Sequence, residues 1–98
     1  MKADVQAINF NVDKKLVSRV NNKINKLGTF YDNILDANVN LKLEKSDVKE
    51  NKLAEVKISV HGNDLFSKKQ SNSFEDAFDQ AYEAVKSQLI KYKEKIRK

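Results

Sequence analysis

Lysine and arginine side chains are concentrated in two segments of a sequence whose charges otherwise balance. Residues 14–26 carry five cations and no acid, and residues 86–98 carry six cations and one acid. The excess of cations over acids in the second segment alone equals the formal net charge of the chain, +5. Concentrated Lys and Arg side chains attract polyanions, above all the phosphates of nucleic acid. The asymmetry therefore indicates a polyanion-binding face rather than general solubility.

The spacing of these cations fits two helices. Intervals of three and four residues return to the same side of a helix, and both segments contain them. Two such helices packed side by side would merge their basic stripes into one groove, which suits the phosphate backbone of RNA. The alternative is a pair of solvated helix faces. The candidate RNA-binding residues are Lys15, Arg19, Lys23 and Lys26 in the first segment, and Lys86, Lys91, Lys93, Lys95 and Arg97 in the second.

Residue types suited to catalysis or metal binding are scarce. The chain has no cysteine, and no carboxylate cluster accompanies its single histidine, His61, which we expect on a polar sheet face at a strand end. Its two glycines, Gly28 and Gly62, are too few for a phosphate-cradling loop, and a helix end and a turn explain them. We therefore expect no enzymatic activity, no cofactor, no metal ion and no small-molecule substrate.

The length and composition predict one domain spanning residues 1–98. The first ten residues, MKADVQAINF, lack the apolar run of a signal peptide, and no segment is long and apolar enough to span a membrane. We therefore expect a cytoplasmic protein that does not bind membranes.

A strand and a helix are predicted first. Residues 2–10 alternate between apolar and polar side chains, as a half-buried strand does. Asp13 is placed to cap a helix with an apolar stripe, and Gly28 is placed to end it. The predicted inward side chains are Ala3, Val5 and Ala7 of the strand, and Leu16, Val20, Ile24 and Leu27 of the helix.

Three further strands follow. Residues 35–44 and 53–61 alternate clearly, and Gly62-Asn63 predicts a two-residue turn into a last strand at about residues 64–71. The last strand has the weakest pattern, because Ser67 and Lys69 occupy its inward positions. The other predicted inward side chains are Leu35, Ala37, Val39, Leu41 and Leu43, then Ala54, Val56, Ile58 and Val60.

The last helix is the strongest signal. Ser73 and Asp76 match a capping box, in which the serine caps the helix and the acid reaches back to it. Apolar residues then recur at spacings of 4, 3, 4, 4, 3 and 4 from Phe74 to Ile96. This stripe runs through the basic segment, which is therefore part of a packed helix and not a frayed tail.

The elements predict an α+β fold of order β-α-β-β-β-α. Each strand has one apolar face, so both helices should cover the same face of a four-stranded sheet. A right-handed crossover makes the first two strands parallel, and hence the sheet mixed. The other face of the sheet should be polar.

Four stretches in this order resemble the ribosome hibernation-promoting factors, also called ribosome-associated inhibitors. They are KINKLGTFYDNI, LDANVNLKLEK, VHGNDL and SFEDAFDQAYEAVKSQLIKYKEKI, and the resemblance covers almost the whole chain. It implies a βαβββα domain that binds small-subunit rRNA in the channel of mRNA and of the A- and P-site tRNAs. By position, Lys23 and Lys26 match the family's first helix, and Lys86, Lys91, Lys93 and Lys95 match its last.

The resemblance thus implies a translation inhibitor that silences idle ribosomes, either one by one or by helping them to pair. We expect the protein to be a monomer off the ribosome. Because the chain ends at Lys98, it resembles the short form, which lacks a second, dimerising domain. Ser67 and Lys69 depart from the family's small or apolar residues. Two alternatives remain: a free-standing double-stranded-RNA module, and a protein–protein adaptor that uses the polar sheet face or binds an acidic partner.

Overall fold

Four strands and two helices follow one another in the predicted order. The computed structural model describes residues 3–8, 10–31, 33–44 and 51–96. The elements are β1 (Asp4–Ile8), α1 (Lys14–Phe30), β2 (Ile34–Leu43), β3 (Lys52–Val60), β4 (Asn63–Ser71) and α2 (Phe74–Ile96). The predicted α+β fold is confirmed.

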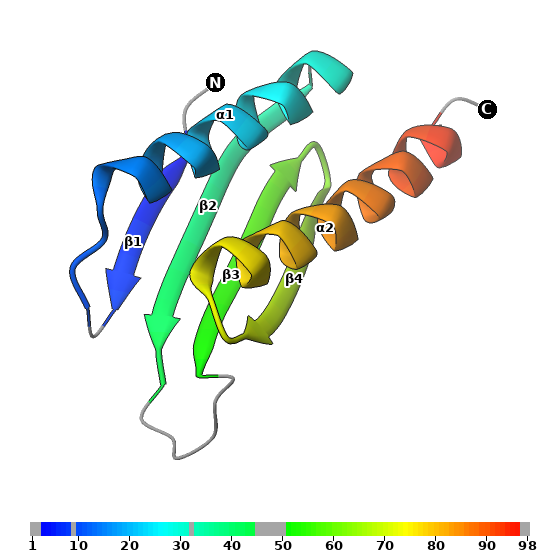
Figure 1. Ribbon diagram of the computed structural model, residues 1–98. Coiled ribbons are helices and arrows are strands. Elements are labelled where there is room, and N and C mark those ends of the chain that lie inside the picture. The colour runs from blue at the N-terminus through cyan, green and yellow to red at the C-terminus, as the bar shows by residue number, and fades with distance from the viewer. Residues whose placement is uncertain (1–2, 9, 32, 45–50, 97–98) are drawn as a thin grey trace.

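The strands form one mixed sheet in the order β1-β2-β3-β4. β1 pairs with β2 in parallel, and the two other pairs are antiparallel. Both helices lie on the same face of the sheet and run in the same direction, α1 over the β1–β2 half and α2 over the β3–β4 half (Figure 1). The C-terminal ends of both basic segments therefore point the same way.

The core lies between this sheet face and the helices. The four predicted side chains of α1 and all four of β3 are buried, as are Ala3, Ala37, Val39 and Leu41. On α2 the stripe is buried from Phe78 to Leu89, while Ile96 ends the helix with a side chain outside the described part of the chain. Apolar periodicity thus located most of the core, although Ala7 and Leu43 are only half-buried.

The inward direction predicted for Leu35 is wrong. Its side chain is 69% exposed, whereas Ile34 packs against the core. The register of β2 against β3 shifts between Ile34 and Asp36, so Leu35 is the extra residue of an irregularity. An inserted residue breaks the alternation of a strand and turns its neighbour to the other face.

The two glycine predictions also need correction. The helix continues through Gly28 to Phe30, and the Tyr31 N–H caps it by donating to the Leu27 carbonyl at 3.0 Å. The β-hairpin turn is His61-Gly62, one residue earlier than predicted, because Val60 already pairs with Asn63. Gly62 has φ +79°, a conformation that glycine adopts without steric cost.

The weak last strand is real and forms an edge of the sheet. Its inward positions hold Leu65 and Ser67, both buried, and then Lys69, which is exposed. Edge strands tolerate such polar positions, because a side chain there can reach solvent around the helix.

Both predicted cap residues are present, but across the described residues the capping box predicted for α2 is formed in one direction only, in which Ser73 accepts from Asp76. Asp13 Oδ1 accepts from the Leu16 N–H at 2.8 Å, and Ser73 Oγ accepts from the Asp76 N–H at 3.1 Å. The Oδ2 atom of Asp76 accepts from Ser71 Oγ and from Gln80 Nε2. These contacts fix where α2 begins, and hence the position of every cation along it.

Candidate nucleic-acid interface

The outer surface of α1 carries the first basic stripe. Because Val20 and Ile24 are buried against the sheet, the exposed side chains of Lys15 and Lys26 point away from the core. An open hollow runs along this surface, and all of its lining comes from α1. It adds three residues to the predicted set, and its lining consists of Lys14, Lys15, Ser18, Arg19, Asn22, Lys23 and Lys26.

The lysines of α2 divide between its two flanks. Gln88 contacts Phe66 of β4, which identifies the flank that faces the sheet edge. At 100° per residue Lys91 and Lys95 lie toward this flank. Lys93 donates instead to the Phe30 carbonyl of α1 at 3.2 Å, and Lys86, seven residues earlier, shares its flank. The flank of α2 that faces α1 therefore carries only part of the second stripe.

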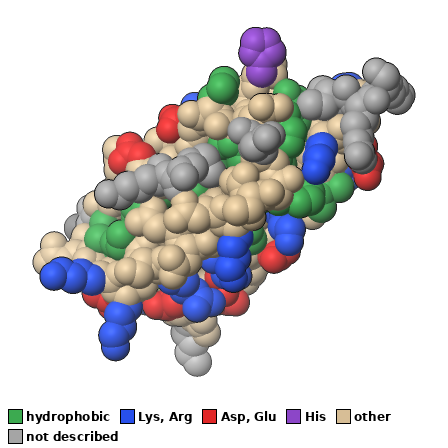
Figure 2. Space-filling model, turned by 90° about the horizontal axis from the view of Figure 1, so that it is seen from above, with side chains coloured by type: hydrophobic (Ala, Val, Ile, Leu, Met, Phe, Trp, Pro, Cys, Tyr) green, Lys and Arg blue, Asp and Glu red, His purple; other side chains and the backbone are tan. Residues whose placement is uncertain are grey.

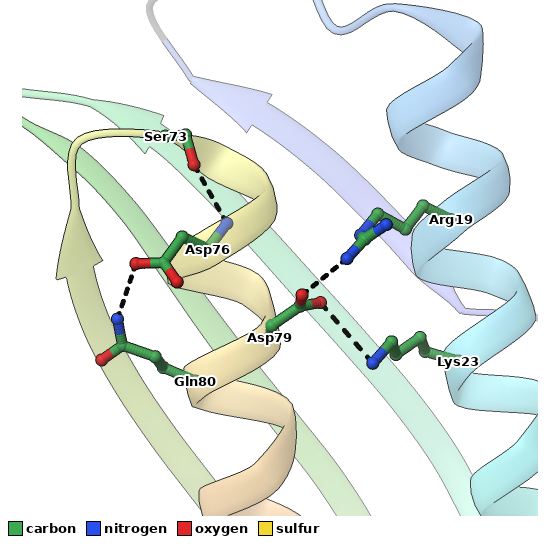
Figure 3. A network of polar contacts seen from close by, with 6 residues as sticks. All are labelled: Arg19, Lys23, Ser73, Asp76, Asp79 and Gln80. Atoms are coloured by element: carbon green, nitrogen blue, oxygen red, sulfur yellow. Dashed lines mark hydrogen bonds and ion pairs between the residues drawn. The ribbon is translucent and has the colours of Figure 1, made fainter.

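A carboxylate of α2 occupies the space between the helices. Arg19 Nη2 lies 2.6 Å from Asp79 Oδ2, and Lys23 Nζ lies 3.7 Å from Asp79 Oδ1 (Figure 3). The hydrogen bond and the charge of Asp79 raise the pKa of Arg19 above its usual value. Two of the five α1 cations thus face a carboxylate of the same protein.

Aromatic rings accompany the cations where α1 and α2 face each other. Lys23 Nζ lies 5.2 Å from the centre of the Tyr82 ring, and Lys93 Nζ lies 4.6 Å from that of Phe30. Phe30 is 36% exposed, so an aromatic face is available beside the cations. Such rings stabilise ammonium groups and can also stack on bases.

The basic surface is not uniform in charge. Seen from above, the Lys and Arg side chains gather on the side that carries the helices in Figure 1, with Asp and Glu side chains between them (Figure 2). Sequence spacing predicted the cations but missed Asp79, because its partner Arg19 is 60 residues away in the chain.

His61 lies outside this surface (Figure 2). His61 is an exposed turn residue, not a residue of the sheet face as predicted, and its carbonyl accepts from the Tyr92 hydroxyl at 2.8 Å. Arg97 lies outside the described residues. Across the described residues no three His, Asp or Glu side chains come together as metal ligands. No helix in that part of the chain is long and apolar enough to cross a membrane.

The fold has close counterparts among solved structures. A ribosomal subunit interface protein from Coxiella burnetii superposes with a TM-score of 0.83 at 16% identity, covering 95% of this chain and 98% of that one. The N-terminal domain of Thermus thermophilus Protein Y gives a TM-score of 0.79 at 19% identity, covering 94% and 99%. At these identities the likeness concerns the fold alone.

Sequence comparison identifies the family. The ribosome hibernation promotion factor of Bacillus subtilis (strain 168) is 31% identical over 96 residues, which are 98% of this chain. The chain spans 50% of the length of that relative. The family model described as Sigma 54 modulation protein / S30EA ribosomal protein matches residues 3–97. The chain therefore belongs to the Sigma 54 modulation protein / S30EA ribosomal protein family, and the resemblance to ribosome hibernation factors that its sequence indicated is confirmed.

Proposed function

We propose that this protein binds the small ribosomal subunit and silences idle ribosomes by occupying the channel of mRNA and of the A- and P-site tRNAs. It acts by binding rather than by catalysis, in the cytoplasm, as a single domain that is a monomer off the ribosome. The observation that carries this proposal is the basic surface of α1 in a chain of this family. Phosphate backbones are recognised by such surfaces through charge and shape.

The contacts with rRNA come from the cations that the helices present to solvent. Lys15 and Lys26 are exposed on α1, and Lys91 and Lys95 are exposed on α2. Lys86 and Lys93 lie on the flank of α2 that faces α1. Lys93 is oriented by Phe30, so its ammonium group is already held in place when the RNA arrives.

Competition with tRNA tests the mechanism. A domain lodged in the channel cannot share its volume with a P-site tRNA. Added in excess to a purified translation system, the protein should inhibit synthesis, and small subunits loaded with mRNA and P-site tRNA should bind it more slowly than empty subunits. Stable simultaneous binding of this protein and a P-site tRNA would contradict the proposal.

A charge-reversal variant and a competitor RNA separate the proposal from its alternatives. Lys91→Glu combined with Lys93→Glu should inhibit far less, because it places anions where phosphates are expected. A free-standing double-stranded-RNA module would lose its inhibition when bulk duplex RNA is added, and P-site occupancy would make no difference. An adaptor that uses the open sheet face would bind small subunits equally well with or without the two substitutions.

A further inference from the structure

Asp79 contacts two of the cations that should bind phosphate. Among the ion pairs that the structure gives for the described residues, those of Arg19 and Lys23 both end on this one carboxylate. The side chain of Asp79 is 32% exposed, and those of Arg19 and Lys23 are 44% and 30% exposed. All three side chains are thus partly exposed where α1 and α2 face each other, within reach of a bound polyanion.

The carboxylate makes the contacts that a phosphate would make. Carboxylates and phosphates both accept from the N–H groups of a guanidinium, in similar geometry. Asp79 Oδ2 already takes such a bond from Arg19 at 2.6 Å. Asp79 Oδ1 is buried without a hydrogen-bond partner, and it faces Lys23 Nζ at 3.7 Å, which is an ion-pair distance but beyond a hydrogen bond. Both oxygens therefore depend on these cations.

We propose that Asp79 is an internal competitor of RNA phosphate, which withholds Arg19 and Lys23 from the phosphodiester backbone and so lowers the affinity of the helix surface for RNA in general. A phosphate that approaches either cation must displace Asp79 or lie beside it. A phosphate and a carboxylate that lie side by side repel each other, because both are negatively charged. Binding to arbitrary RNA then rests on the remaining cations, such as Lys15 and Lys26. The inference deepens the proposed function, since it concerns the same surface.

The contrary role is that Asp79 positions the two cations for RNA. A positioning carboxylate would hold a cation by one edge and leave its other donors directed at the ligand. The two roles predict opposite signs, because removal of a competitor raises RNA affinity, whereas removal of a positioning group lowers it.

The test is Asp79→Asn, which keeps the size of the side chain and removes its charge. Dissociation constants are measured by fluorescence anisotropy for a random-sequence RNA duplex over a series of salt concentrations. The substitution removes two exposed ion pairs and so frees Arg19 and Lys23. The affinity for the RNA duplex should then rise roughly threefold to tenfold at low salt. If both cations then reach phosphates, the slope of log affinity against log salt steepens by up to about 1.8. Unchanged or weaker duplex binding would overturn the inference.

Two controls assign the effect to these contacts. The first control is Glu83→Gln, which removes one negative charge from an exposed side chain one turn further along α2. It measures how much RNA affinity rises when the protein simply has one acid fewer. In a chain that carries Arg19→Gln and Lys23→Gln, Asp79→Asn should do no more than Glu83→Gln does. A full Asp79→Asn effect in that background would contradict competition at these cations.

Folding and ribosome binding are checked separately. Thermal unfolding followed by circular dichroism establishes that each variant is folded. Asp79→Ser serves as a second uncharged variant, and it should raise the affinity for the RNA duplex by the same amount as Asp79→Asn. The duplex measurement needs no ribosome. Tighter duplex binding by Asp79→Asn, together with no binding of the parent protein to small subunits, would support the competition and contradict the ribosomal role.

Discussion

The cations of the helix surface differ in what surrounds them, although in the sequence they form regular stripes. Lys15 and Lys26 project from α1 into solvent, whereas Arg19 and Lys23 are paired with Asp79. A cation without an acid beside it can neutralise a phosphate and release the counterions condensed on the RNA. A cation that is already paired with an acid contributes less to the free energy of binding. The contribution of each residue to binding therefore follows its neighbours and not its place in the stripe.

Lys26→Gln and Lys23→Gln make a matched pair, one helical turn apart. We expect Lys26→Gln to weaken binding to small subunits and to reduce the dependence of binding on salt by somewhat under one unit of log–log slope. Lys23→Gln should do less, because Asp79 already neutralises part of that charge. Lys26 is exposed and lies outside the apolar core, so Lys26→Gln should leave the free energy of unfolding close to that of the parent protein. Lys23→Gln should lower it slightly, because it removes the cation that faces the buried Asp79 Oδ1. Filter binding at several salt concentrations measures both effects, and an equal loss from the two variants would contradict the ranking.

At the scale of elements, α2 joins the core, the basic surface and the sheet edge. Its inward side chains are buried, while Gln88 satisfies both backbone groups of Phe66 on the edge strand β4. Gln88 Oε1 accepts from the Phe66 N–H at 3.2 Å, and Gln88 Nε2 donates to the Phe66 carbonyl at 2.7 Å. This pair of bonds covers part of an edge that could otherwise pair with another strand. The helix therefore both completes the fold and protects it.

The packing of α2 predicts unequal costs at adjacent positions. Leu89 is fully buried and Ile90 is 37% exposed. Leu89→Ala should lower the free energy of unfolding by about 2–5 kcal/mol, because it leaves a cavity between helix and sheet. Ile90→Ala, a similar truncation one residue later, should change it by no more than about 0.5 kcal/mol. Urea unfolding of the two variants gives both values, and similar losses would mean that the inward face of α2 is elsewhere.

Across the whole molecule, the helix side and the open sheet side differ in charge. On the open face cations pair with acids of the same face. For example, Lys57 Nζ lies 3.7 Å from Asp64 Oδ2. It also carries an amide-rich hollow lined by Gln6, Asn38, Asn40, Glu55, Lys57 and Phe66. Acids and cations mixed in this way give little attraction for a polyanion. The molecule should therefore approach RNA with its helices first.

This orientation predicts which lysines are covered on the ribosome. Brief acetylation of the complex with small subunits, read by mass spectrometry, should show Lys15 and Lys26 protected relative to the free protein. Lys57 and Lys68 on the open sheet side should react as in the free protein, because both are exposed and that side faces away from the RNA. The free protein under the same conditions is the control. If the sheet-side lysines were protected while the α1 lysines stayed reactive, the sheet would face the ribosome. That result would favour an adaptor that uses the sheet face.

The sequence by itself determined the elements, the core and the positions of the cations. Each of these follows from repeats within a few residues, because a side chain returns to the same face after two residues in a strand and after three or four in a helix. Asp13 and Ser73 began their helices as predicted, since a cap bonds only to its own first turn. The signals were local, and so were the structures that they specified.

The tertiary structure decided everything that depends on residues far apart in the chain. The pairing of Arg19 with Asp79 joins positions 60 residues apart, and that of Gln88 with Phe66 joins positions 22 apart. The exposure of Leu35 follows from the register of β2 against β3. Such contacts depend on how helices sit on the sheet and which strand residues face each other, and periodicity carries no information on either. The sequence therefore predicted a basic surface, and only the packing of α2 beside α1 placed a carboxylate within it.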